Sequence, residues 1–268
     1  MTRRAWPLLL LAGCAAEQPT APATTQQPIT LLPVVPDQHV PDYAKRPFEP
    51  LSRANVVAIA QREWRAFGSP VNDEPPGPDG PRDLRLDRQP GLWQRVGDYW
   101  WSSQDAGTRQ GGWTSRYDEY GREYGDIGPA WSAAFIGYVM RAAGAGPRFA
   151  YSPLHAAYIN AAARGEGVLR TERPDSYAPQ PGDLICTGRA SSRNIRFEDL
   201  PAPSFYAHCD IVVTAQPGQI SVIGGNVTAG VTLKNIPTTA DGNLAEPGGR
   251  VVDGRYEWFV TLRVVYDS

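Results

Sequence analysis

Side chains that could do chemistry lie in three segments of the second half of the chain. Ser132 stands in a Trp-Ser-Ala-Ala-Phe segment, His208 begins a His-Cys-Asp-Ile-Val-Val segment, and Asn226 follows an Ile-Gly-Gly segment. Nucleophilic catalysis combines a hydroxyl, an imidazole and a polar orienting group, because a weak nucleophile needs a base and the base must be held in place. These residue types point to acyl transfer, provided that the fold brings the three segments together.

The elements that must position these residues begin with helices. Apolar residues recur at helical spacing from Ser52, and Gly68 ends this pattern. A second helix is predicted from about Pro129 to Ala143, with Pro in the first turn and a glycine after the end. A third, shorter helix is predicted over 154–164. Ser132 therefore lies in the first turn of the second helix.

Runs rich in β-branched residues and joined by short turns follow the helices. We expect strands over 184–186, 210–215, 220–223, 231–236 and 256–266. Helices followed by a series of strands indicate an α+β protein with an antiparallel sheet, because parallel sheets need alternating strands and helices. The predicted fold is therefore one α+β domain over 51–268, in which N-terminal helices pack on an antiparallel sheet of about five strands.

The order of these motifs resembles that of the papain-like cell-wall peptidases and amidases of the NlpC and CHAP type. That family has a Cys-Ala-Ala-Phe-like helix start, a Pro-Gly-Asp turn into a strand, a His at a strand start and a polar residue one strand later. Here the matching segments lie between about residues 125 and 226, and Gln-Pro-Gly-Asp-Leu (180–184) supplies the turn. The resemblance implies a papain-like fold, with Ser132 as nucleophile, His208 as base and Asn226 as the residue that orients the imidazole.

Ser132 departs from the family, which has cysteine at this position. A serine does not ionise as a cysteine does, so it would need His208 as a true general base. Two functions remain open. One is hydrolysis of amide bonds in peptidoglycan peptides by a Ser-His-Asn site. The other is a catalytically inactive domain that binds cell-wall glycan or a partner protein, with Ser132 only a small residue at a helix start.

Further residues are candidates for contact with a substrate. Trp131 precedes the nucleophile position, and Asp210 lies on the same side of its strand as His208 because side chains alternate along a strand. The Trp-rich stretch 93–131 could stack on sugar rings, although aromatic residues more often belong to the core. His155, at the start of the third helix, is interpreted as structural.

The cysteines Cys186 and Cys209 are either a disulfide pair or two buried thiols. An oxidising compartment favours the disulfide. Cys209 is a poor nucleophile candidate, because its side chain should point away from that of His208. We expect no metal site and no cofactor, since neither zinc-ligand spacing nor a phosphate-binding loop is present.

The N-terminus has the pattern of an export signal. Arg3 and Arg4 precede an apolar run, and Leu-Ala-Gly-Cys, which ends at Cys14, resembles the bacterial lipobox. The resemblance implies a signal peptide over 1–13 and a lipid on Cys14. Residues 14–50 are rich in Pro, Thr, Gln and Ala, which is typical of an extended spacer.

Composition narrows the expected partners. The formal net charge is −2, and removal of the signal lowers it further, so nucleic acid is not expected. The predicted partners are peptidoglycan or wall peptides, with membrane contact through the lipid anchor only. Because Ala15 rather than Asp follows Cys14, lipoprotein sorting rules favour the periplasmic face of the outer membrane.

Overall fold

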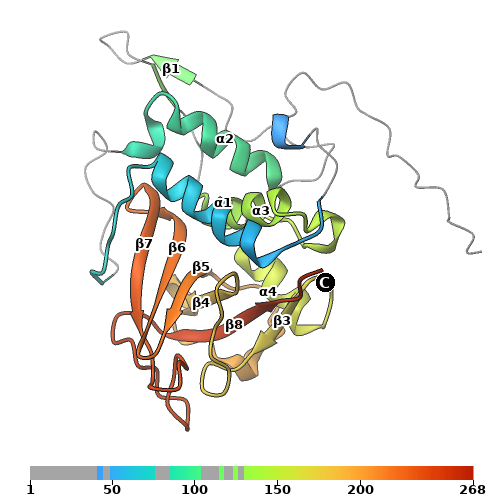
Figure 1. Ribbon diagram of the computed structural model, residues 1–268, viewed down its shortest axis with the longest axis vertical. Coiled ribbons are helices and arrows are strands. Elements are labelled where there is room, and N and C mark those ends of the chain that lie inside the picture. Colours follow the sequence, from blue (N-terminus) through green and yellow to red (C-terminus); the bar gives the residue numbers. More distant parts are fainter. Residues whose placement is uncertain are drawn as a thin grey trace, which may run out of the picture. The chain divides into compact units, whose positions relative to one another are not determined.

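A computed structural model describes residues 41–44, 49–75, 85–103, 115–117, 123–125 and 130–267 (Figure 1). These residues belong to one compact unit that spans 40–268. The predicted signal, the lipidation site at Cys14 and most of the spacer lie outside the described residues. Within these ranges, we found no helix with the length and hydrophobicity that crossing a bilayer would require.

The N-terminal half of the described chain contains four α-helices. They are α1 (Arg53–Ala66), α2 (Leu92–Ser102), α3 (Ser132–Ala142) and α4 (His155–Ala163). Short 3-10 helices cover Asp42–Ala44, Leu86–Arg88, Gly146–Arg148, Ala190–Ser192 and Phe197–Asp199. The cap of α1 is the predicted one, because Ser52 Oγ accepts a hydrogen bond from the Asn55 amide at 3.2 Å. Helix α3 begins at Ser132, three residues later than predicted, and Pro129 lies outside the described residues.

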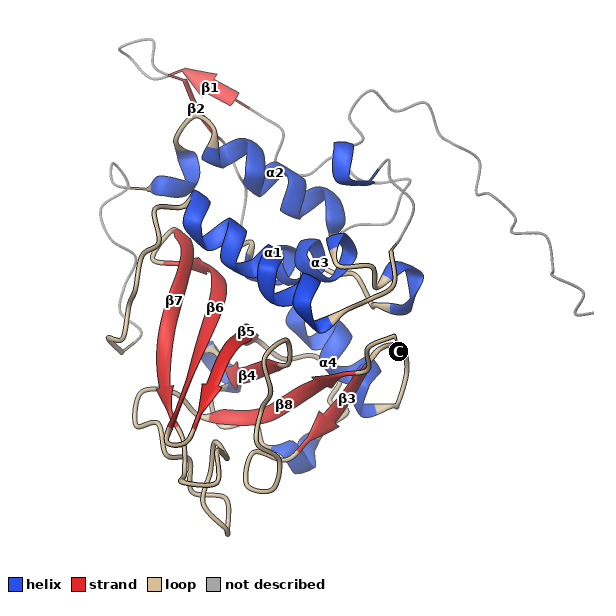
Figure 2. Ribbon diagram, in the orientation of Figure 1, coloured by secondary structure: helices blue, strands red, loops and turns tan. Residues whose placement is uncertain are grey.

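The strands form an antiparallel sheet, so the α+β prediction is confirmed (Figure 2). The six-stranded sheet has the order β3-β8-β4-β5-β6-β7, and a separate pair is made by β1 (Ser115–Tyr117) and β2 (Glu123–Gly125). The strands of the large sheet are β3 (Leu169–Glu172), β4 (Leu184–Gly188), β5 (Ala207–Gln216), β6 (Gln219–Val227), β7 (Gly230–Pro237) and β8 (Trp258–Val264). In the large sheet, the sequence did not predict β3, whose Leu-Arg-Thr-Glu sequence is short and mostly polar, and the pair β1 and β2 was not predicted either.

Apolar side chains cover both faces of the sheet. The larger core cluster joins one face to the helices and includes Phe135, Ile136 and Ile211. A smaller cluster on the other face includes Val212, Leu244 and Trp258, and the chain between β7 and β8 contributes to it. Because Ile211 and Val212 are consecutive in a strand, their side chains lie on opposite faces of the sheet, one in each cluster.

A buried carboxylate links the helices that hold α3 in place. Glu63 of α1 is fully buried and accepts hydrogen bonds from Tyr99 of α2 at 2.6 Å and from Tyr138 of α3 at 3.3 Å. Arg95 of α2 donates to the same carboxylate at 2.9 Å. Buried carboxylates are rarely tolerated without such partners. This network fixes α3 relative to α1 and α2, which helps to position Ser132 at the helix start.

Candidate active site

A cleft of about 560 Å³ lies at the start of α3. Ser132, His208 and Asn226, the three residues that the sequence singled out, all line this cleft. Arg189 and Glu74 contribute charged groups of opposite sign to its walls. The fold therefore brings together segments from α3, β5 and the end of β6, as the sequence predicted. The contacts among these residues differ from the predicted ones.

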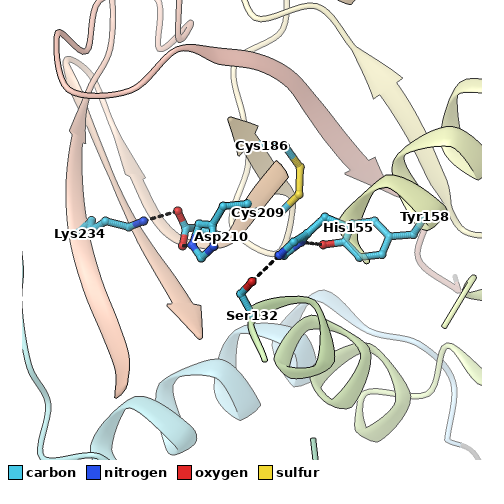
Figure 3. The surroundings of a disulfide bond; sticks show 8 residues. Ser132, His155, Tyr158, Cys186, Cys209, Asp210 and Lys234 are labelled. Carbon is cyan, nitrogen blue, oxygen red and sulfur yellow. Dashed lines mark hydrogen bonds and ion pairs between the residues drawn. A yellow bond between two sulfur atoms is a disulfide. The ribbon is translucent and has the colours of Figure 1, made fainter. Parts of the chain in front are cut away.

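The hydrogen-bond partner of Ser132 is His155 (Figure 3). Ser132 Oγ lies 2.7 Å from His155 Nε2, and the other ring nitrogen of His155 contacts the hydroxyl of Tyr158. The expected pairing of Ser132 with His208 is wrong, because Ser132 contacts His155, the residue that the sequence interpretation treated as structural. The first residues of α3 and α4 meet here, a contact that depends on how the two helices pack and leaves no periodic signal in the sequence.

His155 is held neutral. Burial lowers the pKa of its imidazole well below the ordinary value, and the nearby His208 lowers it further. The centroids of the two imidazole rings are 5.5 Å apart. A neutral imidazole can accept a proton at the ring nitrogen that lacks one. The environment of His155 therefore suits a base that faces a serine hydroxyl.

His208 belongs to a second buried network. Its Nε2 lies 3.0 Å from Asp210 Oδ1, and the other carboxylate oxygen of Asp210 accepts a hydrogen bond from Lys234 Nζ at 2.6 Å. Burial raises the pKa of Asp210, but Lys234 and His208 outweigh burial and hold that pKa well below its usual range. Burial lowers the pKa of His208 to about 4 despite the adjacent carboxylate. His208 is therefore neutral at pH 7, beside an ionised Asp210.

The surroundings of Lys234 explain how this cation can be buried. Its side chain is fully buried on β7, and its ammonium group lies 5.0 Å from the ring centroid of Tyr256 and 5.8 Å from that of Trp258. Aromatic faces attract cations, and the Asp210 carboxylate supplies the opposite charge. Gly224 leaves room for the network, because a Cβ there would overlap Asp210 Oδ1 and approach His208 Nε2.

Asp210, not Asn226, holds His208. The prediction that Asn226 orients the imidazole does not match the contacts in the structure. Residues 208 and 210 lie on the same side of β5, so the carboxylate reaches the ring directly. Asn226 lies within the register irregularity between Gly224 and Val227 and has a left-handed backbone, with φ of 57°. Simple alternation along β6 therefore did not predict where the Asn226 side chain lies.

The two predicted substrate contacts are buried beneath the cleft. Trp131 is 1% exposed, packs against Phe67 and Tyr99, and donates to Asp87 Oδ2 at 3.1 Å. Asp210 has no exposed surface and contacts the cleft only through His208. Neither residue can touch a substrate in this structure, which corrects both assignments. Trp131 instead anchors the residue before Ser132 in the core.

Cys186 and Cys209, the pair considered from the sequence, form a disulfide between the neighbouring strands β4 and β5. Both half-cystines belong to the core cluster that faces the helices. Cys209 thus points away from the side of β5 that carries His208, as strand alternation predicted. Within the described ranges, no group of three or more His, Cys, Asp or Glu side chains could hold a metal ion.

Sequence reasoning missed two residues of the site, Tyr158 and Lys234. Lys234 had a weak signal, because it is one of only two lysines in the chain and lies between apolar residues of a predicted strand. Tyr158 lies three residues after His155, a spacing that places both on one face of a helix.

Comparison with known proteins gives one family. The model described as "Uncharacterized protein conserved in bacteria (DUF2272)" matches residues 87–264, and the chain belongs to this family. The match includes α3, α4 and the strands that carry His208, Asp210 and Lys234. No curated protein and no solved structure matches the chain.

Proposed function

We propose that this member of the DUF2272 family is a cell-envelope hydrolase that cleaves amide bonds in peptidoglycan peptides, with Ser132 as nucleophile and His155 as base. One observation carries the proposal. Ser132 lines the cleft, and its Oγ lies 2.7 Å from Nε2 of a buried, neutral His155. A nucleophile within hydrogen-bond reach of a base, with a third group holding that base, is the arrangement that serine catalysis requires.

The proposed reaction begins with attack of Ser132 Oγ on the carbonyl carbon of the amide. The hydroxyl proton passes to His155 Nε2. This requires that Nδ1 carry the ring proton and donate a hydrogen bond to the Tyr158 oxygen. Backbone N–H groups in the first turn of α3 have no intrahelical acceptor, so they can stabilise the negative charge on the carbonyl oxygen. The imidazolium then protonates the leaving amine, and an ester on Ser132 remains.

We further propose that the domain is a papain-like fold with a changed base. A nucleophile-position residue starts α3, α3 packs against β5 and β6, and a Pro-Gly-Asp turn leads into β4. Asp183 in this turn accepts hydrogen bonds from the Gln180 amide and the Tyr177 hydroxyl, at 3.0 and 2.8 Å. These features support the resemblance. The departure is that the base paired with Ser132 comes from α4 instead of β5.

The envelope location is part of the proposal. The lipobox-like segment that ends at Cys14 favours export and lipid anchoring, and the Pro-rich residues that follow it are compatible with a tether. The Cys186–Cys209 disulfide supports an oxidising compartment, since such bonds are rare where thiols are kept reduced. Both features would place the cleft beside the cell wall.

The test uses the full chain and purified muropeptides, with products resolved by mass spectrometry. We expect new amine and carboxylate termini with the wild type and none with Ser132→Ala or His155→Ala. Ser132→Cys restores the nucleophile of the resembling family and should retain product formation if the cleft accepts a thiol. If wild type and Ser132→Cys both leave muropeptides and other amides intact, the enzyme proposal is wrong. Binding of the inactive protein to purified sacculi would then favour the binding function.

A further inference from the structure

The two histidines of the site differ in their access to the cleft. Both side chains are buried, His208 being 4% and His155 5% exposed, but His208 is one of the residues that line the cleft and His155 is not. His155 contacts Ser132 Oγ, whereas His208 is the histidine that borders the cleft. The proposed reaction needs a water molecule in the cleft, because the Ser132 ester must be hydrolysed before a second turnover.

The tautomer of His208 follows from its partners. An ionised carboxylate only accepts hydrogen bonds, so the contact between His208 Nε2 and Asp210 Oδ1 requires the proton on Nε2. Lys234 donates to the other oxygen of Asp210, which keeps the carboxylate ionised and fixed in place. Among the described residues, His208 Nδ1 has no hydrogen-bond partner. A neutral His208 with its proton on Nε2 has a lone pair on Nδ1.

We propose that His208 Nδ1 accepts the proton of the water that hydrolyses the Ser132 ester, and that the buried Lys234–Asp210 ion pair fixes the tautomer that allows this. The inference rests on the proposed function and assigns the two histidines to successive half-reactions. His155 serves the formation of the ester. His208 is the catalytic residue of its hydrolysis, and Asp210 and Lys234 are positioning residues that act through it.

The step balances without a further reactant. The water oxygen forms a bond to the ester carbonyl carbon while one water proton moves to His208 Nδ1. The tetrahedral intermediate collapses, and the bond between the carbonyl carbon and Ser132 Oγ breaks. Ser132 Oγ takes the proton of the hydroxyl group that the water delivered, the product leaves as a carboxylate, and the proton on His208 passes to solvent in the cleft. The pKa of about 4 keeps His208 unprotonated at neutral pH, as for the carboxylate bases that activate water in other hydrolases.

The test separates the half-reactions with p-nitrophenyl acetate, an activated ester that reports nitrophenol release. The wild-type full chain should give a burst followed by steady turnover. His208→Gln should keep the burst, retain an acetyl group on Ser132 in peptide mass maps, and lose steady turnover by on the order of 100-fold. His155→Ala should lose the burst itself. Ser132→Ala should show no acetyl group at this site.

The tautomer of His208, measured by NMR, tests the roles of Asp210 and Lys234, because a change in stability alone would not alter it. In 15N spectra of the wild type, His208 should show a protonated Nε2 and an unprotonated Nδ1. Asp210→Asn, combined with Lys234→Met to avoid a lone buried charge, should abolish this fixed pattern and slow loss of the acetyl group. Asp253→Asn is the matched control, because Asp253 is a buried carboxylate that pairs with Arg255 and accepts a hydrogen bond from Trp258, without a hydrogen bond to His208 or Asp210.

Three results would overturn the inference. If the wild type forms no acetyl-Ser132, the proposed nucleophile fails and this inference fails with it. If acetyl-Ser132 forms but His208→Gln removes the acetyl group at the wild-type rate, only the role of His208 is wrong. If His208 carries its proton on Nδ1 in the wild type, the positioning by Asp210 and Lys234 is wrong.

Discussion

Ser132 Oγ and His155 Nε2 are 2.7 Å apart, although the two residues begin different helices and are separated by 23 positions. The contact puts both members of the proposed nucleophile–base pair on helix starts. The strand histidine, His208, instead contacts Asp210 and lines the cleft. The site therefore holds two imidazoles with different partners around one serine.

Tyr158→Phe should lower kcat while substrate binding stays unchanged. The substitution keeps the ring and removes the hydroxyl that contacts His155 Nδ1. Loss of one buried hydrogen bond is worth about 1 kcal/mol, so kcat should fall roughly fivefold while KM stays near the wild-type value. Tyr177→Phe is the control, because its hydroxyl bonds to Asp183 at 2.8 Å, outside the residues of the cleft. An equal kcat for both variants would refute the role of Tyr158.

Stability should fall as the pH drops from about 6.5 toward 4. The pKa values of His155 and His208 are lowered in the folded state, so in this window the unfolded chain binds protons that the folded chain does not. Each histidine can contribute up to about 1.4 kcal/mol per pH unit. The charged groups acting on His208 are Asp210, Lys234 and Arg189.

Chemical denaturation at a series of pH values measures this effect. His208→Gln should show a shallower pH dependence of the free energy of unfolding than the wild type, because one of the two histidines no longer titrates in the unfolded chain. Identical slopes for the two proteins between pH 6.5 and 4 would contradict the assignment of a neutral, buried His208.

The Lys234–Asp210 pair should show strong coupling in stability. Lys234→Met alone leaves a buried carboxylate without its cation, which typically costs about 3–5 kcal/mol. The double variant Lys234→Met with Asp210→Asn removes both charges and should be more stable than the single Lys234 variant. Urea unfolding of the two single variants, the double variant and the wild type gives the coupling energy. Additive effects would show that the two side chains do not interact.

The disulfide should stabilise the strands that carry His208. Cys186 and Cys209 enclose 23 positions of sequence, and bonds that close loops of this size typically contribute about 2–4 kcal/mol. The Cys186→Ser, Cys209→Ser double variant should therefore unfold at a lower temperature than the oxidised wild type. Reduction of the wild type should lower its thermal midpoint in the same direction. An unchanged midpoint after complete reduction would exclude this contribution.

Local patterns were sufficient to predict most of the fold. The cap at Ser52, the glycine stops and the β-branched runs gave helices α1, α3 and α4 and five of the six strands in the large sheet, because each of these signals acts within a few residues. Helix α2 was not resolved, since its Trp-rich sequence has apolar residues on several faces. Strand β3 was missed because its pairing with β8 depends on distant residues.

The site was predicted in its location but not in its contacts. Ser132, His208 and Asn226 line one cleft, as the order of the motifs predicted. The partner of Ser132 could not be predicted, because the approach of α3 and α4 is set by packing across the core. Strand alternation placed His208 and Asp210 on one side of their strand, but no local pattern favoured a buried carboxylate over the amide of Asn226 as the partner of His208.

The most direct test of the account is covalent labelling of the full chain with a fluorophosphonate, which reacts with activated serine hydroxyls. Peptide mapping should place the phosphonyl group on Ser132 in the wild type, with no label at this site in Ser132→Ala and much slower labelling in His155→Ala. The Asp253→Asn protein should label like the wild type. If the folded wild type remains unlabelled at Ser132, or if His155→Ala labels at the wild-type rate, Ser132 is not activated by His155 and the account is wrong.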